Sequence, residues 1–312
     1  MSAPALVELE GVNGDWLTLS GPGMGEQGCH LNTDVEGIAH APIKTLYTEH
    51  TFQEGATYAG ERFMRRDLVI GVWVTDDNGE SWRDNESRLY RAVSTSEVFK
   101  LWITDEDAGT RRYLNLRLSE QPETAMERDP RLLGRQLVIL TCTAGDPFWY
   151  DEQPWMDEFT STEDTTDGHF QVGSVTVWNP TDHPAWAIWL LEGPSIPRLP
   201  DFSWGSRRYN KADYDAATQD AARKIVMAQV LGGGPSPGLT YGVQVNTKPD
   251  SQMGGYQSRD RSYNKRMNGV RFLYPLPPGL QKTEVPVSIS KAPVGKKVGL
   301  VIYHRHRHPW ML

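Results

Sequence analysis

In the first half of the chain, apolar residues alternate with polar residues over short runs, which is the pattern of β-strands with one buried face. The run at 110–118 is the clearest, because Leu114, Leu116 and Leu118 fall on one side of it. Asn13-Gly14 stands between two such runs and predicts a tight hairpin, since a type I′ turn needs positive φ at both central residues. Further strands are predicted at residues 6–10, 16–19, 43–51, 66–76, 98–104 and 134–143.

A helical spacing interrupts this pattern after the polar break at 76–79. Ser81 and Asp84 form a capping pattern, and apolar residues beyond them fall on one helical stripe. We assign the packing of this helix to Trp82, Leu89, Tyr90 and Val93. The first half therefore predicts a β-barrel or sandwich with one helix laid across it.

The second half contains many short apolar runs separated by turn signals, which is typical of a β-sandwich or jelly roll. An Ala-rich stretch that begins at Asp213 predicts a helical turn, followed by a strand. The predicted strands are at residues 172–178, 185–192, 223–231, 240–246, 270–274, 284–290 and 298–304.

The midpoint of the chain predicts a domain boundary. An apolar strand there runs into a turn at 145–147, and proline cannot continue a strand ladder. Large aromatic residues follow at once, and we interpret them as a rigid junction between two domains, residues 1–152 and residues 153–312. The junction residues are Asp146, Pro147, Phe148, Trp149 and Trp155.

Composition narrows the class of protein. The 312 residues include 29 Gly and 21 Pro, and 23% are charged, which suits a turn-rich β protein better than a helical bundle or a disordered chain. No run of 18 apolar residues occurs, so no membrane span is expected. The amino terminus lacks the features of a signal peptide, so assembly in the cytoplasm is expected. Cys29 and Cys142 are not in a C-x-x-C pair, and neither is expected to be functional.

Charge is distributed unevenly along the chain, whose net charge is −8. Residues 1–150 hold 24 acidic residues against 14 Lys and Arg, a balance of −10. Residues 248–312 hold 12 basic residues against three acidic ones, a balance of +9. Such asymmetry is typical of complementary surfaces, within one molecule or between neighbours.

Several sequence segments together resemble the distal tail proteins (Dit) of long-tailed bacteriophages, especially those of actinobacterial hosts. The first is Ala-Gly-Asp-Pro-Phe-Trp-Tyr-Asp-Glu at 144–152, which closes a domain of the expected length. The segments at 178–194, 245–250, 274–279 and 303–310 also resemble the family in order and spacing. The chain departs from the simplest pattern of the family by an insertion at roughly 195–222.

The resemblance implies an all-β fold with one helix in the first domain. The first domain is then a split β-barrel belt domain, and the second is a peripheral β-sandwich like those of galectins and carbohydrate-binding modules. It also implies a structural virion protein, located at the distal end of the tail and assembled in the host cytoplasm. The expected partners are further copies in a ring, usually a hexamer, the tail tube protein, the tail tip hub and the tape measure protein.

The same resemblance implies that DNA meets the protein only in transit through the ring, and that no membrane is involved. An acidic belt around the channel would keep DNA from adhering to the wall. We expect no enzymatic activity, no catalytic residue, no cofactor and no metal. The junction residues and the packing residues of the helix are the positions that we expect to matter for architecture.

Three further features of the sequence have other possible functions. His304, His306 and His308 would align on one face of a strand, where a His-x-His pair can bind zinc if other ligands are supplied. Glu192 and Asp201 form a conceivable glycosidase pair, but the sequence gives no evidence of the required separation. The alternative function is a host-surface carbohydrate-binding protein, with Trp178 or Trp204 of the second domain stacking on sugar rings.

Overall fold

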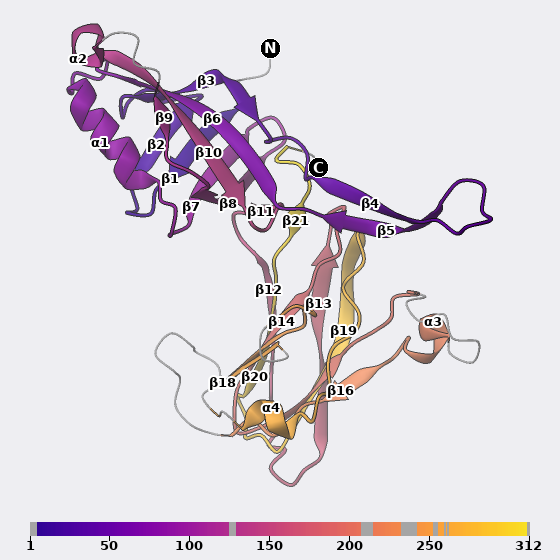
Figure 1. The fold of residues 1–312 in the computed structure, drawn as a ribbon. Helices are drawn as coiled ribbons and strands as arrows, with labels where there is room; N and C mark the ends of the chain where they lie inside the picture. Colours follow the sequence, from indigo (N-terminus) through magenta and orange to yellow (C-terminus); the bar gives the residue numbers. More distant parts are fainter. Residues whose placement is uncertain are drawn as a thin grey trace. The chain divides into compact units, whose positions relative to one another are not determined.

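The computed structural model describes residues 5–124, 129–206, 215–231, 242–251, 255–258, 260 and 262–310. The chain divides into two compact units, shown in Figure 1. The first comprises Met1–Glu152 together with His306–Leu312, and the second comprises Gln153–Arg305. None of the helices in the described part of the chain is both long enough and apolar enough to cross a membrane.

The first unit is built on one curved sheet whose main strands follow the order β2-β1-β7-β8-β10-β6-β3. The long central pair is antiparallel, with β10 and β6 aligned over ten residues, as expected for the run that is apolar on both faces. Apolar side chains from these strands form a single core. The strands are β1 (Leu6–Glu10), β2 (Trp16–Ser20), β3 (Cys29–Glu36), β6 (Arg66–Thr75), β7 (Phe99–Asp105), β8 (Thr110–Leu118), β9 (Glu123–Thr124), β10 (Arg135–Ala144), β11 (Trp149–Asp151) and β21 (Arg305–His306).

Helix α1 (Trp82–Ala92) packs on this core, and a single turn, α2 (Pro130–Leu133), precedes β10. Ser81 is the N-cap of α1, as predicted: its hydroxyl accepts a hydrogen bond from the Asp84 backbone N–H at 3.3 Å. Leu89 and Ala92 are buried on the side of the helix that faces the sheet. The predicted class, an all-β first domain with one substantial helix, is confirmed.

A separate two-stranded sheet also belongs to the first unit. It consists of β4 (Ile43–Thr48) and β5 (Thr57–Phe63), which pair antiparallel. Figure 1 shows this hairpin extending away from the curved sheet of the same unit. The strand predicted at 43–51 is therefore present, but it ends at Thr48.

The second unit is a β-sandwich, as predicted. Two antiparallel sheets enclose one core to which both contribute apolar side chains. The five-stranded sheet has the order β12 (Trp155–Thr160), β20 (Lys297–Ile302), β14 (Ala187–Leu191), β17 (Val243–Asn246) and β18 (Tyr256–Ser258). The four-stranded sheet has the order β13 (Phe170–Asn179), β19 (Leu280–Ser290), β15 (Ile196–Pro200) and β16 (Lys224–Val226), and the short helices are α3 (Ala216–Gln219) and α4 (Tyr263–Arg266).

One predicted strand of the second unit is wrong: residues 270–274 form no strand. The reason is that a carboxylate takes the place of a strand partner. The backbone N–H groups of Leu273 and Tyr274 both donate hydrogen bonds to the side chain of Asp201, at 3.0 and 3.1 Å. A buried amide needs a partner, and here the partner is a side chain.

The end of the chain also differs from the predicted division at 153–312. Residues His306–Leu312 belong to the first unit, not to the sandwich. Strand β21 pairs with β11, and Arg112 donates a hydrogen bond from Nη1 to the carbonyl oxygen of His308 at 3.0 Å. The chain therefore passes between the two units twice.

Candidate functional site

The β4–β5 hairpin exposes nearly all of its side chains. Every residue of β4 is exposed, and so are five of the seven residues of β5. Tyr47 and Tyr58 face each other across the strands with ring centroids 6.0 Å apart, and Phe52 at the tip is fully exposed. Because an isolated two-stranded hairpin is only marginally stable in water, and exposed apolar side chains mark interaction sites, this hairpin is a candidate binding element.

The root of the hairpin is held by a buried arginine. Arg66 is completely buried, and its guanidinium donates to backbone carbonyl oxygens of Pro147 at 2.9 Å, Gly37 at 3.2 Å, Arg307 at 2.9 Å, and Ile38. Burial lowers the pKa of Arg66 to about 10, so the side chain stays charged at neutral pH. One cation thus joins the exit of β3, the turn before β11 and the end of the chain.

A glycine makes this arrangement possible. Gly37 has a φ of +80°, and a side chain at this position would lie 2.2 Å from the carbonyl oxygen of Asp67. Only glycine adopts such a conformation without strain while allowing so close a backbone contact. The chain can therefore leave β3 and enter the hairpin within a few residues.

A row of aromatic rings crosses the face of the curved sheet that is turned away from the core. Neighbouring ring centroids are 5.8 Å apart for Trp16 and Trp102, 4.9 Å for Trp102 and Tyr113, and 5.6 Å for Tyr113 and Tyr150. These residues come from four different strands. Aromatic pairs across strands stabilise a sheet, so this row of rings stabilises the pairing of the four strands.

Charged side chains on that face are paired with each other. Lys100 lies 3.0 Å from Glu10, and Arg111 lies 3.3 Å from Glu8 and 2.7 Å from Glu152. The Arg111 guanidinium is also 4.7 Å from the centroid of Trp102, within cation–π range. Acidic residues on this face are thus balanced locally by cations.

The residues predicted to pack the helix do not share one environment. Leu89 is completely buried, and Val93, which caps the C-terminus of α1, is 7% exposed. Trp82 is partly buried against the same core, whereas Tyr90 is 38% exposed. Leu89 and Val93 therefore anchor the helix, and Tyr90 is presented to solvent.

The predicted junction residues are divided between the two units. The Tyr150 hydroxyl donates to Asp146 at 2.7 Å, Phe148 and Trp149 are buried in the first unit, and the Phe148 ring lies 4.9 Å from that of Phe63 in the hairpin. Trp155 belongs to the sandwich, where its indole N–H donates to the Thr176 carbonyl at 2.8 Å. Their role as a rigid junction stays a prediction.

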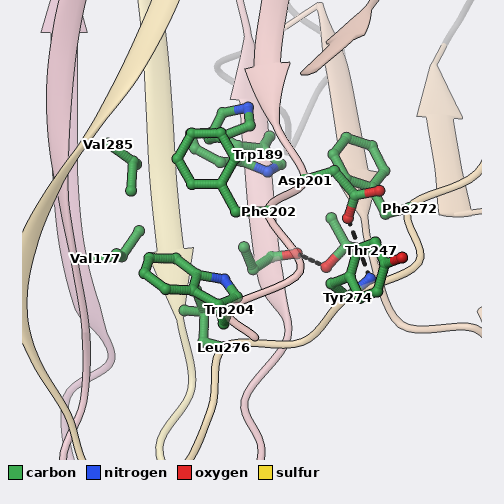
Figure 2. Close-up of a pocket in the computed structure, with 12 residues that line it drawn as sticks. Val177, Trp189, Asp201, Phe202, Trp204, Thr247, Phe272, Tyr274, Leu276 and Val285 are labelled. Carbon is green, nitrogen blue, oxygen red and sulfur yellow. Dashed lines mark hydrogen bonds between the residues drawn. The ribbon is translucent and has the colours of Figure 1, made fainter. Parts of the chain in front are cut away.

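The second unit contains a small cavity at one end of its core, shown in Figure 2. Its volume is about 30 Å³, which is room for about one water molecule. The wall is mainly aromatic and aliphatic, and Trp204 and Phe202 from the predicted insertion form part of it with ring centroids 5.9 Å apart.

Asp201 is the acidic residue beside this cavity, and its hydrogen-bonding capacity is used inside the protein. Its side chain is completely buried and accepts from the backbone of Leu273 and Tyr274 and from Arg223. Burial raises the pKa of Asp201, and the two backbone N–H groups oppose that shift. The geometry makes Asp201 a structural carboxylate.

The other candidate of the glycosidase pair has a comparable backbone contact. Glu192 accepts a hydrogen bond from the Lys297 backbone N–H at 3.2 Å.

The two cysteine thiols are buried, and burial raises the pKa of Cys29 and of Cys142 to about 12. At neutral pH both thiols are protonated, which removes the thiolate that cysteine chemistry requires.

The three histidines near the end of the chain have different partners. The His304 imidazole is 3.1 Å from the Trp178 carbonyl oxygen, His306 lies 2.8 Å from Asp151, and His308 stacks edge-on with His40 at 4.5 Å. Within the described residues, no group of three or more His, Cys, Asp or Glu side chains is arranged to hold a metal ion. The indole of Trp178 packs against Trp155 at 5.2 Å.

Comparison with known proteins places this fold among phage tail proteins. No protein-family model matches the chain. The minor tail protein Gp27 of Mycobacterium phage D29 is 31% identical over 346 residues, which covers 99% of this chain and 98% of that protein. The minor tail protein Gp27 of Mycobacterium phage L5 is 30% identical with the same coverage.

A solved structure also supports the fold. A chain in the structure of the phage P2 baseplate, in its activated conformation with Ca, aligns over 99% of this chain and all of that one, with 8% identity and a TM-score of 0.50. The SPP1 Dit protein aligns over 97% of this chain and 99% of its own, with 12% identity and a TM-score of 0.49.

The chain is therefore a phage minor tail protein. It belongs to the family that includes Gp27 of the mycobacterial phages D29 and L5. This confirms the recognition of a phage minor tail protein from the sequence.

Two parts of the candidate site were not found from the sequence. The strand at 43–51 was predicted, but the alternation of residues within it does not show that both faces are exposed. The contacts of Arg66 were missed because backbone carbonyls are its partners, and these carry no sequence signal.

Proposed function

We propose that this chain is the distal tail protein of its phage, and that several copies close through the first unit into a ring at the end of the tail tube. The ring, which we take to be a hexamer, joins the tube to the tail tip. The exposed β4–β5 hairpin is the observation that carries this proposal. It presents Tyr47, Phe52 and Tyr58 to solvent, in a chain whose relatives are minor tail proteins.

A closed ring requires two unlike surfaces on each subunit, because a heterologous contact repeats around the axis. The hairpin supplies one surface, which projects from its own unit (Figure 1). The other surface is on the body of the first unit of the next copy. The remaining partners are the tail tube protein, the tail tip hub and the tape measure protein, and assembly takes place in the host cytoplasm.

The ring encloses the channel through which DNA leaves the particle. Residues 1–150 carry 24 acidic residues against 14 Lys and Arg, and a negative wall would repel the phosphate backbone. The peripheral sandwich projects around the ring in this arrangement. A density map of the assembled ring tests the idea, because a channel lined by Lys and Arg would contradict it.

The hairpin is tested by changing its exposed aromatics in the full-length chain. The double variant Tyr47→Ser/Tyr58→Ser removes apolar surface that is exposed in the single chain, so folding is preserved while ring formation is lost. The control is Tyr303→Ser, which changes an exposed tyrosine of the sandwich. The assembled mass and the incorporation into tails are measured for each variant. Incorporation is included because a tail protein can require another tail protein before its copies close into a ring.

The proposal predicts that Tyr303→Ser is incorporated like the wild type and that the double variant is absent from tails. Normal incorporation of the double variant would contradict the role of the hairpin. The absence of multiple copies of the wild-type chain from tails would contradict the ring itself.

A further inference from the structure

The carboxy-terminal segment packs on the root of the hairpin, although more than 240 residues separate the two in sequence. Phe63 is the last residue of β5, and the Arg307 guanidinium lies 5.0 Å from the centroid of its ring. Its Nη2 atom is 3.9 Å from a carboxylate oxygen of Glu61. His308 contacts His40, in the connection between β3 and β4. Both strands of the hairpin are thus approached at their root.

The main chain of the segment is fixed to the body of the first unit at the same place. Arg66 donates to the carbonyl oxygen of Arg307 at 2.9 Å, and Arg112 donates to that of His308 at 3.0 Å. Both arginines are buried, with 0% and 3% of their surface exposed. Hydrogen bonds from charged donors are stronger than those between neutral groups, so the segment is firmly attached.

Two further contacts lie at the root of the hairpin. At its root the Met64 backbone N–H donates to the Pro42 carbonyl at 2.9 Å, and the Phe63 ring packs on Phe148 at 4.9 Å. Beyond the root, the two strands bond to each other and expose their side chains. Phe63 is therefore a point at which the root of the hairpin contacts both the body of the first unit and the carboxy-terminal segment.

From these contacts we propose that residues 306–310 are a brace that holds the root of the β4–β5 hairpin and fixes its direction for docking onto a second copy of this chain. The docking step rests on the proposed function, whereas the bracing does not. A hairpin held in one direction loses less conformational freedom on binding than a free one, and so binds more tightly. Arg307 acts as a positioning residue, through Phe63.

Bracing differs from ordinary stabilisation in what it protects. A segment that only covered the core would protect the whole curved sheet from opening. A brace protects the hairpin selectively, because local opening of the hairpin leaves β10 and β6 paired. Hydrogen exchange of backbone amides, measured peptide by peptide on the full-length chain, separates these two roles.

The test uses Arg307→Ala, which removes the contact with Phe63 but leaves the backbone carbonyl for Arg66. The matched control is Arg198→Ala, since Arg198 lies 4.0 Å above the Phe170 ring in the sandwich and reproduces the same type of contact elsewhere. A truncation that lacks 307–312 removes the side-chain and main-chain contacts together. Arg307→Lys keeps the charge over the ring and is expected to preserve protection.

The brace predicts that amides of residues 43–63 exchange at least about tenfold faster in Arg307→Ala, while those of β10 are unchanged. The truncation also removes the carbonyl acceptors of the buried Arg66 and Arg112, so it is expected to lose protection in β10 as well. Arg198→Ala leaves residues 43–63 as in the wild type. Unchanged exchange of 43–63 in Arg307→Ala would overturn the proposal, as would an equal loss of protection in β10 in that variant.

The same variants distinguish the brace from the ring. If Tyr47→Ser/Tyr58→Ser enters tails normally, the proposed function fails, and the exchange result still decides the brace. If that double variant is excluded from tails but Arg307→Ala retains full protection of 43–63 and normal incorporation, the brace alone fails.

Discussion

The guanidinium carbon of Arg66 lies 5.9 Å from the centre of the Trp149 ring, inside the first unit. Trp149 donates from its indole nitrogen to the Ile38 carbonyl oxygen at 3.3 Å, the same oxygen to which Arg66 donates. A cation and an aromatic ring thus share one backbone acceptor at the root of the hairpin. Trp149, which the sequence assigns to the domain junction, thus contacts the root of the hairpin.

Replacement of Arg66 by lysine is expected to destabilise the first unit. Lysine retains the charge but lacks the planar fork that reaches several carbonyls at once. The expected loss is about 3 kcal/mol or more, since each hydrogen bond to a charged group contributes about 1.5–3 kcal/mol. Chemical denaturation measures the loss, and Arg65→Lys is the control, because Arg65 is exposed and pairs with Asp67 at the surface. Equal stability of the two variants would contradict the assignment.

The helix α1 is expected to depend on Leu89 and much less on Tyr90. Leu89→Ala leaves a cavity in the core of the first unit and should cost about 2–5 kcal/mol in free energy of unfolding. Tyr90→Ala changes a partly exposed side chain and should cost about 1 kcal/mol or less. Thermal or denaturant unfolding of both variants gives the comparison. A larger loss of free energy of unfolding in Tyr90→Ala than in Leu89→Ala would show that Tyr90 anchors the helix, and would contradict this prediction.

The loop that precedes β13 contains a histidine with a raised pKa. The main cause is the side-chain hydrogen bond to Asp167, whose oxygen lies 2.5 Å from His169 Nδ1, and Glu163 contributes from 3.5 Å. His169 therefore stabilises the loop fully below its ordinary pKa, and this contribution is lost as pH rises through the raised value. NMR titration of the imidazole should show the shift, and Asp167→Asn should lower the pKa toward its ordinary value. A titration unchanged by Asp167→Asn would show that the pairing is absent in solution.

The strand pattern of the sequence was sufficient for most of the fold. The alternation at 110–118 corresponds to β8, because a strand with one buried face has apolar residues at every second position. The doubly apolar run at 68–74 corresponds to the centre of β6, because a strand covered on both faces loses that alternation. The cap at Ser81 and the stripe that contains Leu89 placed α1. These features are local, and local propensity agrees with the tertiary environment at each of them.

The features that the sequence did not reveal depend on contacts between distant residues. Residues 270–274 have the composition of a strand, but the backbone N–H groups of Leu273 and Tyr274 donate to the carboxylate of Asp201 and not to a neighbouring strand. The tail at 306–310 was assigned from the sequence to the second domain, residues 153–312. Its actual position in the first unit is set by backbone carbonyls that accept from Arg66 and Arg112. Every residue has a backbone carbonyl, so the sequence does not show which carbonyl accepts a hydrogen bond from a given arginine.

The most direct test of the proposed function is cryo-electron microscopy of intact tails that contain this chain. We predict a closed ring of several identical copies at the end of the tail tube, with each β4–β5 hairpin against the first unit of the adjacent copy. A single copy at this position, or a ring in which the hairpins touch no neighbour, would contradict the account.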